Sequence, residues 1–373
     1  MSNRSPEEEE DFIKLWKFFK WVDEVGWSDS FIEPRFQELK KIFPGFSNSD
    51  LTLAHWLTYV YNYVIGVERI WHECLLIMSY VAWKFQGGGG VDEIKEEVEG
   101  EDGGFSLPDE YVKKLHPGCK SSSGEVCFKH FPTKTNPRVW RTLRILDKMG
   151  ERDFVKFLKR WKTVKDAAKA LFVLTYSKES EDRSIERLKK GDFKGIEEED
   201  LLEAPKRLWS ALQEYVKDDK TFLGEKPAGW RPEELELPQD KWNEKFFEGV
   251  VRPRFEVLLR LTLPRMRENF PPRKFLRELY RQKGSKLQNL GLYPAQFDVT
   301  FDLRCSFGNC QFCPLGGEEW RKRCEDARKS GNPCPILEHL FGYAAACEGE
   351  KCPLLSDPPP VVCGPRISGR PVK

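Results

Sequence analysis

Eight of the eleven cysteines in this 373-residue chain fall between Cys305 and Cys363. Such clustering constrains the fold, because thiols gathered in one segment commonly bind a metal or form disulfides. The N-terminal sequence MSNRSPEEEEDF has neither the basic nor the apolar segment of a secretory signal, so we expect a cytoplasmic protein. Clustered cysteines in the cytoplasm favour metal ligation, although hyperthermophile cytosols also contain disulfides. The chain is rich in Lys and Glu, as hyperthermophile proteins are.

The first four of these cysteines have the spacing of an iron–sulfur site. Cys305 is followed by Cys310 after four residues, by Cys313 after two more, and by Cys324 after a gap of ten. A C-x4-C-x2-C core with a distant fourth cysteine is typical of plant-type ferredoxins, and a proline after a ligand cysteine, here Pro314, is common in such loops. We therefore predict that these four thiolates hold an iron–sulfur cluster. A four-cysteine zinc site and disulfides are the alternatives.

The other four cysteines of this segment have no assigned role. Cys334, Cys347, Cys352 and Cys363 are separated by gaps of 12, 4 and 10 residues. They form a second four-cysteine metal site, or disulfides, or remain as thiols. The sequence does not divide the eight cysteines between these arrangements.

A second constellation lies earlier in the chain, in the sequence HPGCKSSSGEVCFKH. Two residues separate His116 from Cys119, and after seven further residues Cys127 and His130 are again separated by two residues. Two Cys and two His match the tetrahedral ligand set of structural zinc. We therefore predict that His116, Cys119, Cys127 and His130 bind Zn2+. A disulfide between the two cysteines, or two thiols in a surface loop, are the alternatives.

The C-x2-C-P-L element of residues 310–315 resembles the C-terminal loop of helix-hairpin-helix DNA glycosylases of the endonuclease III kind. The resemblance implies an all-helical fold, a [4Fe–4S] cluster and DNA as the partner. It also implies that the loop places Arg321, Lys322 and Arg323 on DNA, and that an aspartate at a helix start, matched by Asp240, is catalytic.

The match covers about residues 240–324, and the sequence departs from the family pattern in two respects. The first and last gaps between the four cysteines differ from those of the family. The glycine–hydrophobic–glycine turn that precedes the family's catalytic aspartate is absent from residues 180–239.

Apolar residues recur mainly at helical spacing, so we predict a mainly α protein with bundle-like helical domains and a metal-stabilised, cysteine-rich C-terminal module. Hydrophobic residues make up 39% of the chain, which excludes a disordered protein. We predict an N-terminal helical region at 1–86, an acidic glycine-rich linker at 87–107, a zinc-type loop at 108–131, a helical domain at 132–292 and an iron–sulfur-type module at 293–373.

Several local signals support these helices. Pro137 is expected at the first position of one helix, and Thr163 with Asp166 is expected to cap another. The alternation of apolar residues from Phe297 to Leu303 predicts a single short strand. The longest uncharged apolar run, Leu51 to Val67, has 17 residues, which is shorter than the about 20 that a membrane span needs. We expect two buried helices in the apolar stretch of residues 51–85 and no membrane partner.

Basic residues are concentrated in two segments although the whole chain has a net charge of only +1. Residues 252–286 contain eleven Lys and Arg against three Glu, and residues 138–169 contain eleven against four acidic residues. Such segregation predicts a face that follows nucleic-acid phosphates. Ordinary solvated helix faces, paired with neighbouring acids, are the alternative. The residues we expect to contact nucleic acid are Arg273, Lys274, Arg277, Arg281, Arg321, Lys322 and Arg323.

The sequence therefore predicts a DNA-binding iron–sulfur protein, with base-excision glycosylase activity as the enzymatic form of that hypothesis. The alternative is a non-enzymatic, metal-stabilised module that binds nucleic acid or a protein partner. No phosphate-binding loop, dinucleotide fingerprint, zinc-protease motif or nucleophile elbow is present in the sequence.

Overall fold

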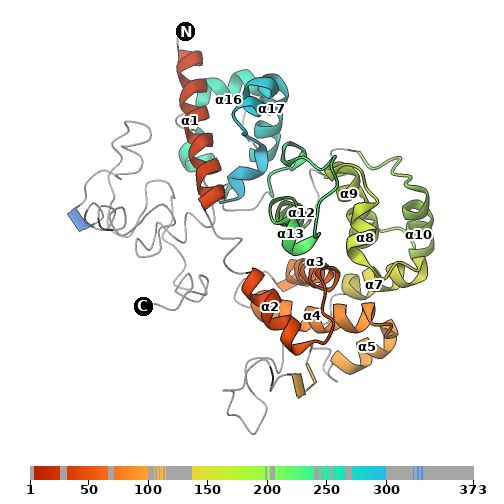
Figure 1. The fold of residues 1–373 in the computed structure, drawn as a ribbon. Coiled ribbons are helices and arrows are strands. Elements are labelled where there is room, and N and C mark those ends of the chain that lie inside the picture. Colours follow the sequence, from red (N-terminus) through yellow and green to blue (C-terminus); the bar gives the residue numbers. More distant parts are fainter. Residues whose placement is uncertain are drawn as a thin grey trace. The chain divides into compact units, whose positions relative to one another are not determined.

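The structure is a computed structural model that is mainly helical (Figure 1). It describes residues 4–25, 32–65, 71–99, 105, 107–108, 110–111, 114, 137–197, 200–201, 206–238, 243–244, 247–252, 255–264, 271–299, 322, 326 and 329–330. Within these ranges the only β pairing is an isolated bridge between Glu99 and Phe105. The prediction of a mainly α fold is therefore confirmed for this part of the chain, whereas the cysteine-rich module lies outside it.

Contacts divide the chain into two compact units, one made of residues 1–27 and 235–373 and the other of residues 28–234. The first unit thus joins the N-terminal helix to the C-terminal part of the chain. This division differs from the predicted linear order, in which residues 1–86 form one region. The periodicity of a helix shows which face it buries and does not show which distant helix covers that face.

The first unit is built on an aromatic core. Its elements are α1 (Arg4–Val25), η4 (Phe247–Val251), α16 (Glu256–Thr262), α17 (Pro272–Asn289) and η5 (Pro294–Val299). Phe12 of α1 contacts Phe255, Phe275 and Phe297, with ring centroids 5.2 to 5.8 Å apart. Burial of such rings supplies most of the stabilisation of a small helical unit.

The expected strand at residues 297–303 is wrong where the structure describes it. Pro294–Val299 is a 3₁₀ helix, and Phe297 is fully buried against the rings of Phe12 and Phe19. Gln296 accepts a hydrogen bond from Nε1 of Trp16 at 3.1 Å. Tertiary packing against α1 therefore overrides the weak alternating pattern.

The second unit contains the remaining described helices. They are α2 (Ile32–Ile42), α3 (Asn48–Ile65), α4 (Trp71–Gln86), α5 (Val91–Val98), α7 (Pro137–Met149), α8 (Phe154–Lys159), α9 (Val164–Leu171), η2 (Phe172–Tyr176), α10 (Glu181–Lys190), α12 (Lys206–Lys217), α13 (Asp219–Phe222) and η3 (Pro232–Glu234). The two buried helices expected around residues 51–85 are α3 and α4, which pack against each other. Cys74 is a fully buried core residue of α4.

The predicted linker at 87–107 contains a helix that we did not expect. Val91, Ile94 and Val98 are buried on one face of α5, which packs against α4 and α7. Glycines before this helix and acidic residues on its exposed face conceal a short i, i+3, i+7 apolar stripe. No helix among the described residues is long and apolar enough to cross a membrane.

Candidate nucleic-acid interface

All of the predicted metal, cluster and catalytic residues, and two of the predicted nucleic-acid contacts, lie outside the described part of the chain. These residues are Asp240, His116, Cys119, Cys127, His130, Cys305, Cys310, Cys313, Cys324, Arg321 and Arg323. Within the described part, no group of three or more His, Cys, Asp or Glu side chains has the arrangement of a metal site. The iron–sulfur, zinc and glycosylase predictions therefore remain predictions.

Helix α17 carries four residues predicted to contact nucleic acid, and the structure separates them. Arg273 is 2% exposed and donates from Nε to the backbone oxygen of Leu237 at 2.5 Å, so it is part of the interior. Burial lowers its pKa to about 10, an effect that the negative charge of Glu236 opposes. Lys274 is exposed, and so is Lys322, which was predicted to lie in the iron–sulfur loop.

Most of the other described basic residues of segment 252–286 are held by acids of the same unit. Arg277 lies 3.7 Å from Glu236, and Arg281 binds Glu278 through two hydrogen bonds of 2.7 and 2.9 Å. Further ion pairs join Arg252 to Glu248, Arg260 to Glu256, and both Lys283 and Lys286 to Glu9. The arrangement matches the alternative of solvated helix faces with acidic neighbours.

The second basic segment, in contrast, contributes to a convergent group of arginines. Arg138, Arg141, Arg144 and Lys148 recur every three or four residues on α7 and therefore share one face. That face meets α10, because α7 and α10 pack against each other. We define the α7–α10 cluster by its basic members, which are Arg138, Arg141, Arg144, Lys148, Lys178, Arg183 and Arg187.

A π-helical turn positions one edge of this cluster. Residues 172–176 continue α9 as η2, and Thr175 lies between Trp56 and Thr142 in the core. Trp56 donates from Nε1 to the Thr175 hydroxyl at 3.2 Å, and the Thr142 hydroxyl donates to the backbone oxygen of Arg138 at 2.7 Å. The 3.1 Å bond between the two hydroxyls must then run from Thr175 to Thr142. The wider turn also places Tyr176 under the guanidinium of Arg138, 5.4 Å from the ring centroid.

Helix α10 has well-defined ends. Ser180 caps its N-terminus, with the hydroxyl accepting from the backbone N–H of Arg183. Gly191 ends it with a φ of +63°, a conformation that a residue with a side chain rarely adopts. Between these ends Ser184 and Leu188 are buried. Arg183, one residue before Ser184, is exposed, whereas Arg187, three residues after it, is partly buried on the neighbouring part of the helix surface.

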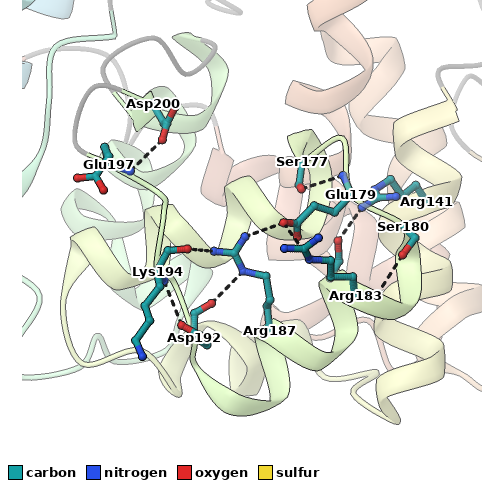
Figure 2. Close-up of polar contacts among 11 residues, drawn as sticks. Arg141, Ser177, Glu179, Ser180, Arg183, Arg187, Asp192, Lys194, Glu197 and Asp200 are labelled. Atoms are coloured by element: carbon teal, nitrogen blue, oxygen red, sulfur yellow. Dashed lines mark hydrogen bonds and ion pairs between the residues drawn. The ribbon is translucent and has the colours of Figure 1, made fainter.

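Glu179 lies at the centre of the cluster (Figure 2). Its Oε1 accepts from Nη1 of Arg187 at 2.9 Å and lies 3.4 Å from Nε of Arg183. Arg187 also donates to the backbone oxygens of Asp192 at 3.0 Å and Lys194 at 2.7 Å. The Arg187 side chain is 15% exposed in this position, and three acceptors fix the orientation of its guanidinium.

Arg141 of α7 lies on the other side of the cluster centre that Glu179 occupies (Figure 2). Its Nη2 donates to the Ser184 hydroxyl at 2.8 Å, whereas its Nε–H is buried with no acceptor among the described residues. Burial lowers the pKa of Arg141, and the charges of Glu181 and Glu179 oppose that effect. Oε2 of Glu179 is likewise buried without a donor in the described part of the chain. Buried polar atoms without partners are uncommon and call for an explanation.

A second carboxylate organises the other end of the cluster. Glu181 accepts from Nε of Arg144 at 2.8 Å and from Nζ of Lys148 at 3.0 Å. Burial by itself raises the pKa of Glu181, but the hydrogen bonds and charges of Arg144 and Lys148 outweigh it and hold the pKa below 4.5. Glu181 is therefore an anion at neutral pH and fixes two cationic side chains on the α7 surface.

The cluster remains strongly positive after its internal acids are counted. Four of its seven basic side chains pair with Glu179, Glu181 or Asp182, and the seven bases against these three acids leave four positive charges in a chain with a net charge of +1. Glu186, a further acid close to Arg183, is paired with Lys190. Guanidinium groups present a planar set of donors that fits phosphate oxygens in a bidentate manner. The arrangement can therefore bind phosphate groups.

The sequence indicated only part of this surface. The segment 138–169 was singled out for its charge, but Arg183 and Arg187 were missed, because residues 179–190 alternate acids and bases and have little net charge. The missing signal was the i, i+4 spacing of Arg183 and Arg187 together with the three-residue recurrence of arginine on α7.

Comparison with family models, with curated proteins and with solved structures finds no match to this chain. The function must therefore be argued from the chemistry of the described residues and from the sequence.

Proposed function

We propose that this protein binds nucleic acid, and that the α7–α10 cluster contacts the phosphate backbone. The observation that carries the proposal is the convergence of basic side chains from two packed helices, with an excess of four positive charges over the acids that hold them. Phosphate contacts provide most of the affinity of non-specific nucleic-acid binding. A local excess of charge is what such contacts need, and a high net charge of the whole chain is not required.

DNA is the expected partner, because the C-x2-C-P-L element resembles the loop of DNA glycosylases. Under this proposal Cys305, Cys310, Cys313 and Cys324 hold a [4Fe–4S] cluster, since four thiolates are the donor set that such clusters take. The cluster orders the loop that contains Arg321 to Arg323 and has no redox role. In the same way, His116, Cys119, Cys127 and His130 bind Zn2+ and order their loop.

Binding can be tested with two arginines that differ mainly in their surroundings. Arg183 and Arg260 are each about seven-tenths exposed, and each has a carboxylate partner four residues earlier on the chain. Arg183 belongs to the α7–α10 cluster, whereas Arg260 belongs to the internally paired segment. The variants Arg183→Gln and Arg260→Gln therefore remove the same charge from two similar helix surfaces.

We expect wild-type protein to bind a labelled DNA duplex with an affinity that falls steeply with salt, as measured by fluorescence anisotropy. Arg183→Gln is expected to lower the slope of log Kd against log salt by about 1, because the substitution leaves one phosphate without its cation. Arg260→Gln is expected to leave it unchanged. Equal slopes in all three proteins would contradict the proposal. Binding of a protein partner with no measurable binding of DNA would favour the interaction module.

The glycosylase form of the hypothesis depends on Asp240. Base release from duplexes carrying a panel of lesions, compared between wild type and Asp240→Asn, tests it separately from binding. Release that is abolished in the variant while duplex affinity is unchanged would support it. Binding without release from any lesion would leave a nucleic-acid-binding protein with no such activity.

A further inference from the structure

The carboxylate of Glu179 matches the donors around it poorly. Arg183 and Arg187 both approach its Oε1, while Oε2 has no donor among the described residues. Nε of Arg141, on the α7 side of the same cluster, has no acceptor in the described part of the chain. Figure 2 shows Arg183 and Arg187 directed at Glu179, with Arg141 beside them. Three guanidinium groups thus gather around one carboxylate whose two oxygens match their donors incompletely.

We propose that the place occupied by the Glu179 carboxylate is a binding site for the terminal phosphate of a nucleic-acid strand. This inference rests on the proposed nucleic-acid function and makes it more specific. A phosphomonoester has three terminal oxygens and a charge between about −1.5 and −2 near neutral pH. Three oxygens match the three guanidiniums of Arg141, Arg183 and Arg187, whereas a carboxylate offers two.

The charge of the ligand distinguishes a strand end from the strand interior. An internal phosphodiester has two non-bridging oxygens and a single negative charge. It therefore offers the arginines the same number of acceptor oxygens and the same charge as the Glu179 carboxylate that it would replace. A terminal phosphate adds an oxygen and nearly a full charge. We therefore expect displacement of Glu179 to increase the binding affinity for a strand end and not for an internal phosphate of the backbone.

Two of the three guanidinium groups are held in place by contacts that do not involve Glu179. Arg187 is fixed by the backbone oxygens of Asp192 and Lys194, and Arg141 by the hydroxyl of Ser184. These groups therefore keep their orientation if the carboxylate leaves, and a ligand gains from donors that are already ordered.

Glu179 itself lies on a short surface connection. Residues 177–180 join η2 to α10, and both Lys178 and Ser180 are exposed. The Glu179 side chain is 22% exposed, so a rotation about its own bonds carries the carboxylate toward solvent without moving either helix. Displacement of the resident anion is thus compatible with the fold.

The experiment compares strands of one sequence that differ only at one end. Full-length protein is titrated with a single strand that carries a 3′ fluorophore and either a 5′-phosphate or a 5′-hydroxyl, and with the reversed pair that carries a 5′ fluorophore and a 3′-phosphate or a 3′-hydroxyl. For at least one end, we expect the phosphorylated strand to bind about ten-fold more tightly, which corresponds to one additional charge-assisted hydrogen bond. Arg183→Gln is expected to reduce that ratio to near one, and Arg260→Gln to preserve it.

Arg141→Lys provides a second test, because it keeps the charge and removes the planar set of donors. A reduced preference for the phosphorylated end in this variant supports the assignment, and an unchanged preference in both Arg141→Lys and Arg183→Gln overturns it. Equal wild-type affinities for phosphorylated and hydroxylated ends, with salt-dependent binding intact, overturn the terminal site and leave the proposed function standing. Failure of every strand and duplex to bind overturns the proposed function as well.

Discussion

Nη1 of Arg187 lies 2.9 Å from Oε1 of Glu179, and the same guanidinium binds the backbone that follows α10. One side chain in the helix therefore ties the segment before α10 to the segment after it. Because the side chain is 15% exposed, water replaces these bonds poorly when they are broken.

Replacement of Arg187 by lysine is expected to destabilise the second unit by about 1–3 kcal/mol, since an ammonium group cannot serve the same three acceptors in one plane. Urea unfolding followed by tryptophan fluorescence measures the loss of stability. The matched control is Lys190→Gln, which removes an exposed ion pair with Glu186 in the same helix and is expected to leave the stability nearly unchanged. Equal destabilisation by the two variants would show that Arg187 is only a surface charge.

The hydroxyl of Thr175 is the second testable feature, because it joins the π-helical turn to α3 and α7. Thr175→Val keeps the shape of the side chain but leaves the buried Nε1–H of Trp56 without that acceptor, which is expected to cost about 1–3 kcal/mol. Thr175→Ser retains the hydroxyl and should be destabilised less. If valine is tolerated as well as serine in thermal unfolding, the hydrogen-bonded chain from Trp56 to Arg138 contributes little to the position of η2.

The buried ring of His55 predicts a dependence of stability on pH. His55 is 1% exposed, its Nδ1 lies 3.4 Å from the Tyr215 hydroxyl, and burial lowers its pKa from 6.5 to about 3. Between these two values the unfolded chain binds a proton that the folded chain does not, so stability is retained above pH 6.5 and falls as the pH decreases toward 3. The expected contribution at pH 5 is about 2 kcal/mol relative to high pH.

The His55→Gln variant isolates this effect, since glutamine does not titrate. The variant is expected to be less stable than wild type at neutral pH, but its stability should decrease less between about pH 7 and pH 5 in urea unfolding. A wild-type His55 ring that becomes protonated near about pH 6 in an NMR titration would contradict the account of its burial.

Local sequence signals predicted the helices well where the apolar stripe is long or the cap is well defined. The helix starting at Pro137 and the cap formed by Thr163 and Asp166 are both present. The short helix α5 was missed, because Val91, Ile94 and Val98 are only three apolar positions in an acidic, glycine-flanked segment. The aromatic core that Phe297 joins depends on α1, which lies at the other end of the chain, and no local pattern contains that information.

The charge pattern predicted the presence of basic surfaces better than their location. A linear count made residues 252–286 the more basic segment, yet the structure places acids such as Glu9 and Glu236 from elsewhere in the chain beside its lysines and arginines. The sequence showed only the α7 part of the α7–α10 cluster. Arg187 lies near the arginines of α7 only because α7 and α10 pack against each other. Net charge along a sequence is a sum over neighbours in the chain, whereas a binding surface depends on neighbours in space.

Metal content tests the predictions made for the cysteine-rich segments. Protein purified without oxygen is expected to be brown and to contain about four irons per chain. Cys310→Ser is expected to reduce the iron content and the thermal stability together, because the cluster orders its loop, while Cys119→Ser should reduce the zinc content instead. Zinc as the only metal, or cysteines joined in pairs with no metal bound, would contradict the iron–sulfur prediction.

The central claim, that nucleic acid binds at the α7–α10 cluster, is tested most directly by hydrogen–deuterium exchange with and without a DNA duplex. The account predicts slower exchange on binding in residues 137–149 and 177–190, and little change in residues 272–289, where the basic side chains are held by acids. Protection confined to residues 272–289, or no protection of α7 and α10 under conditions where the duplex is bound, would contradict it.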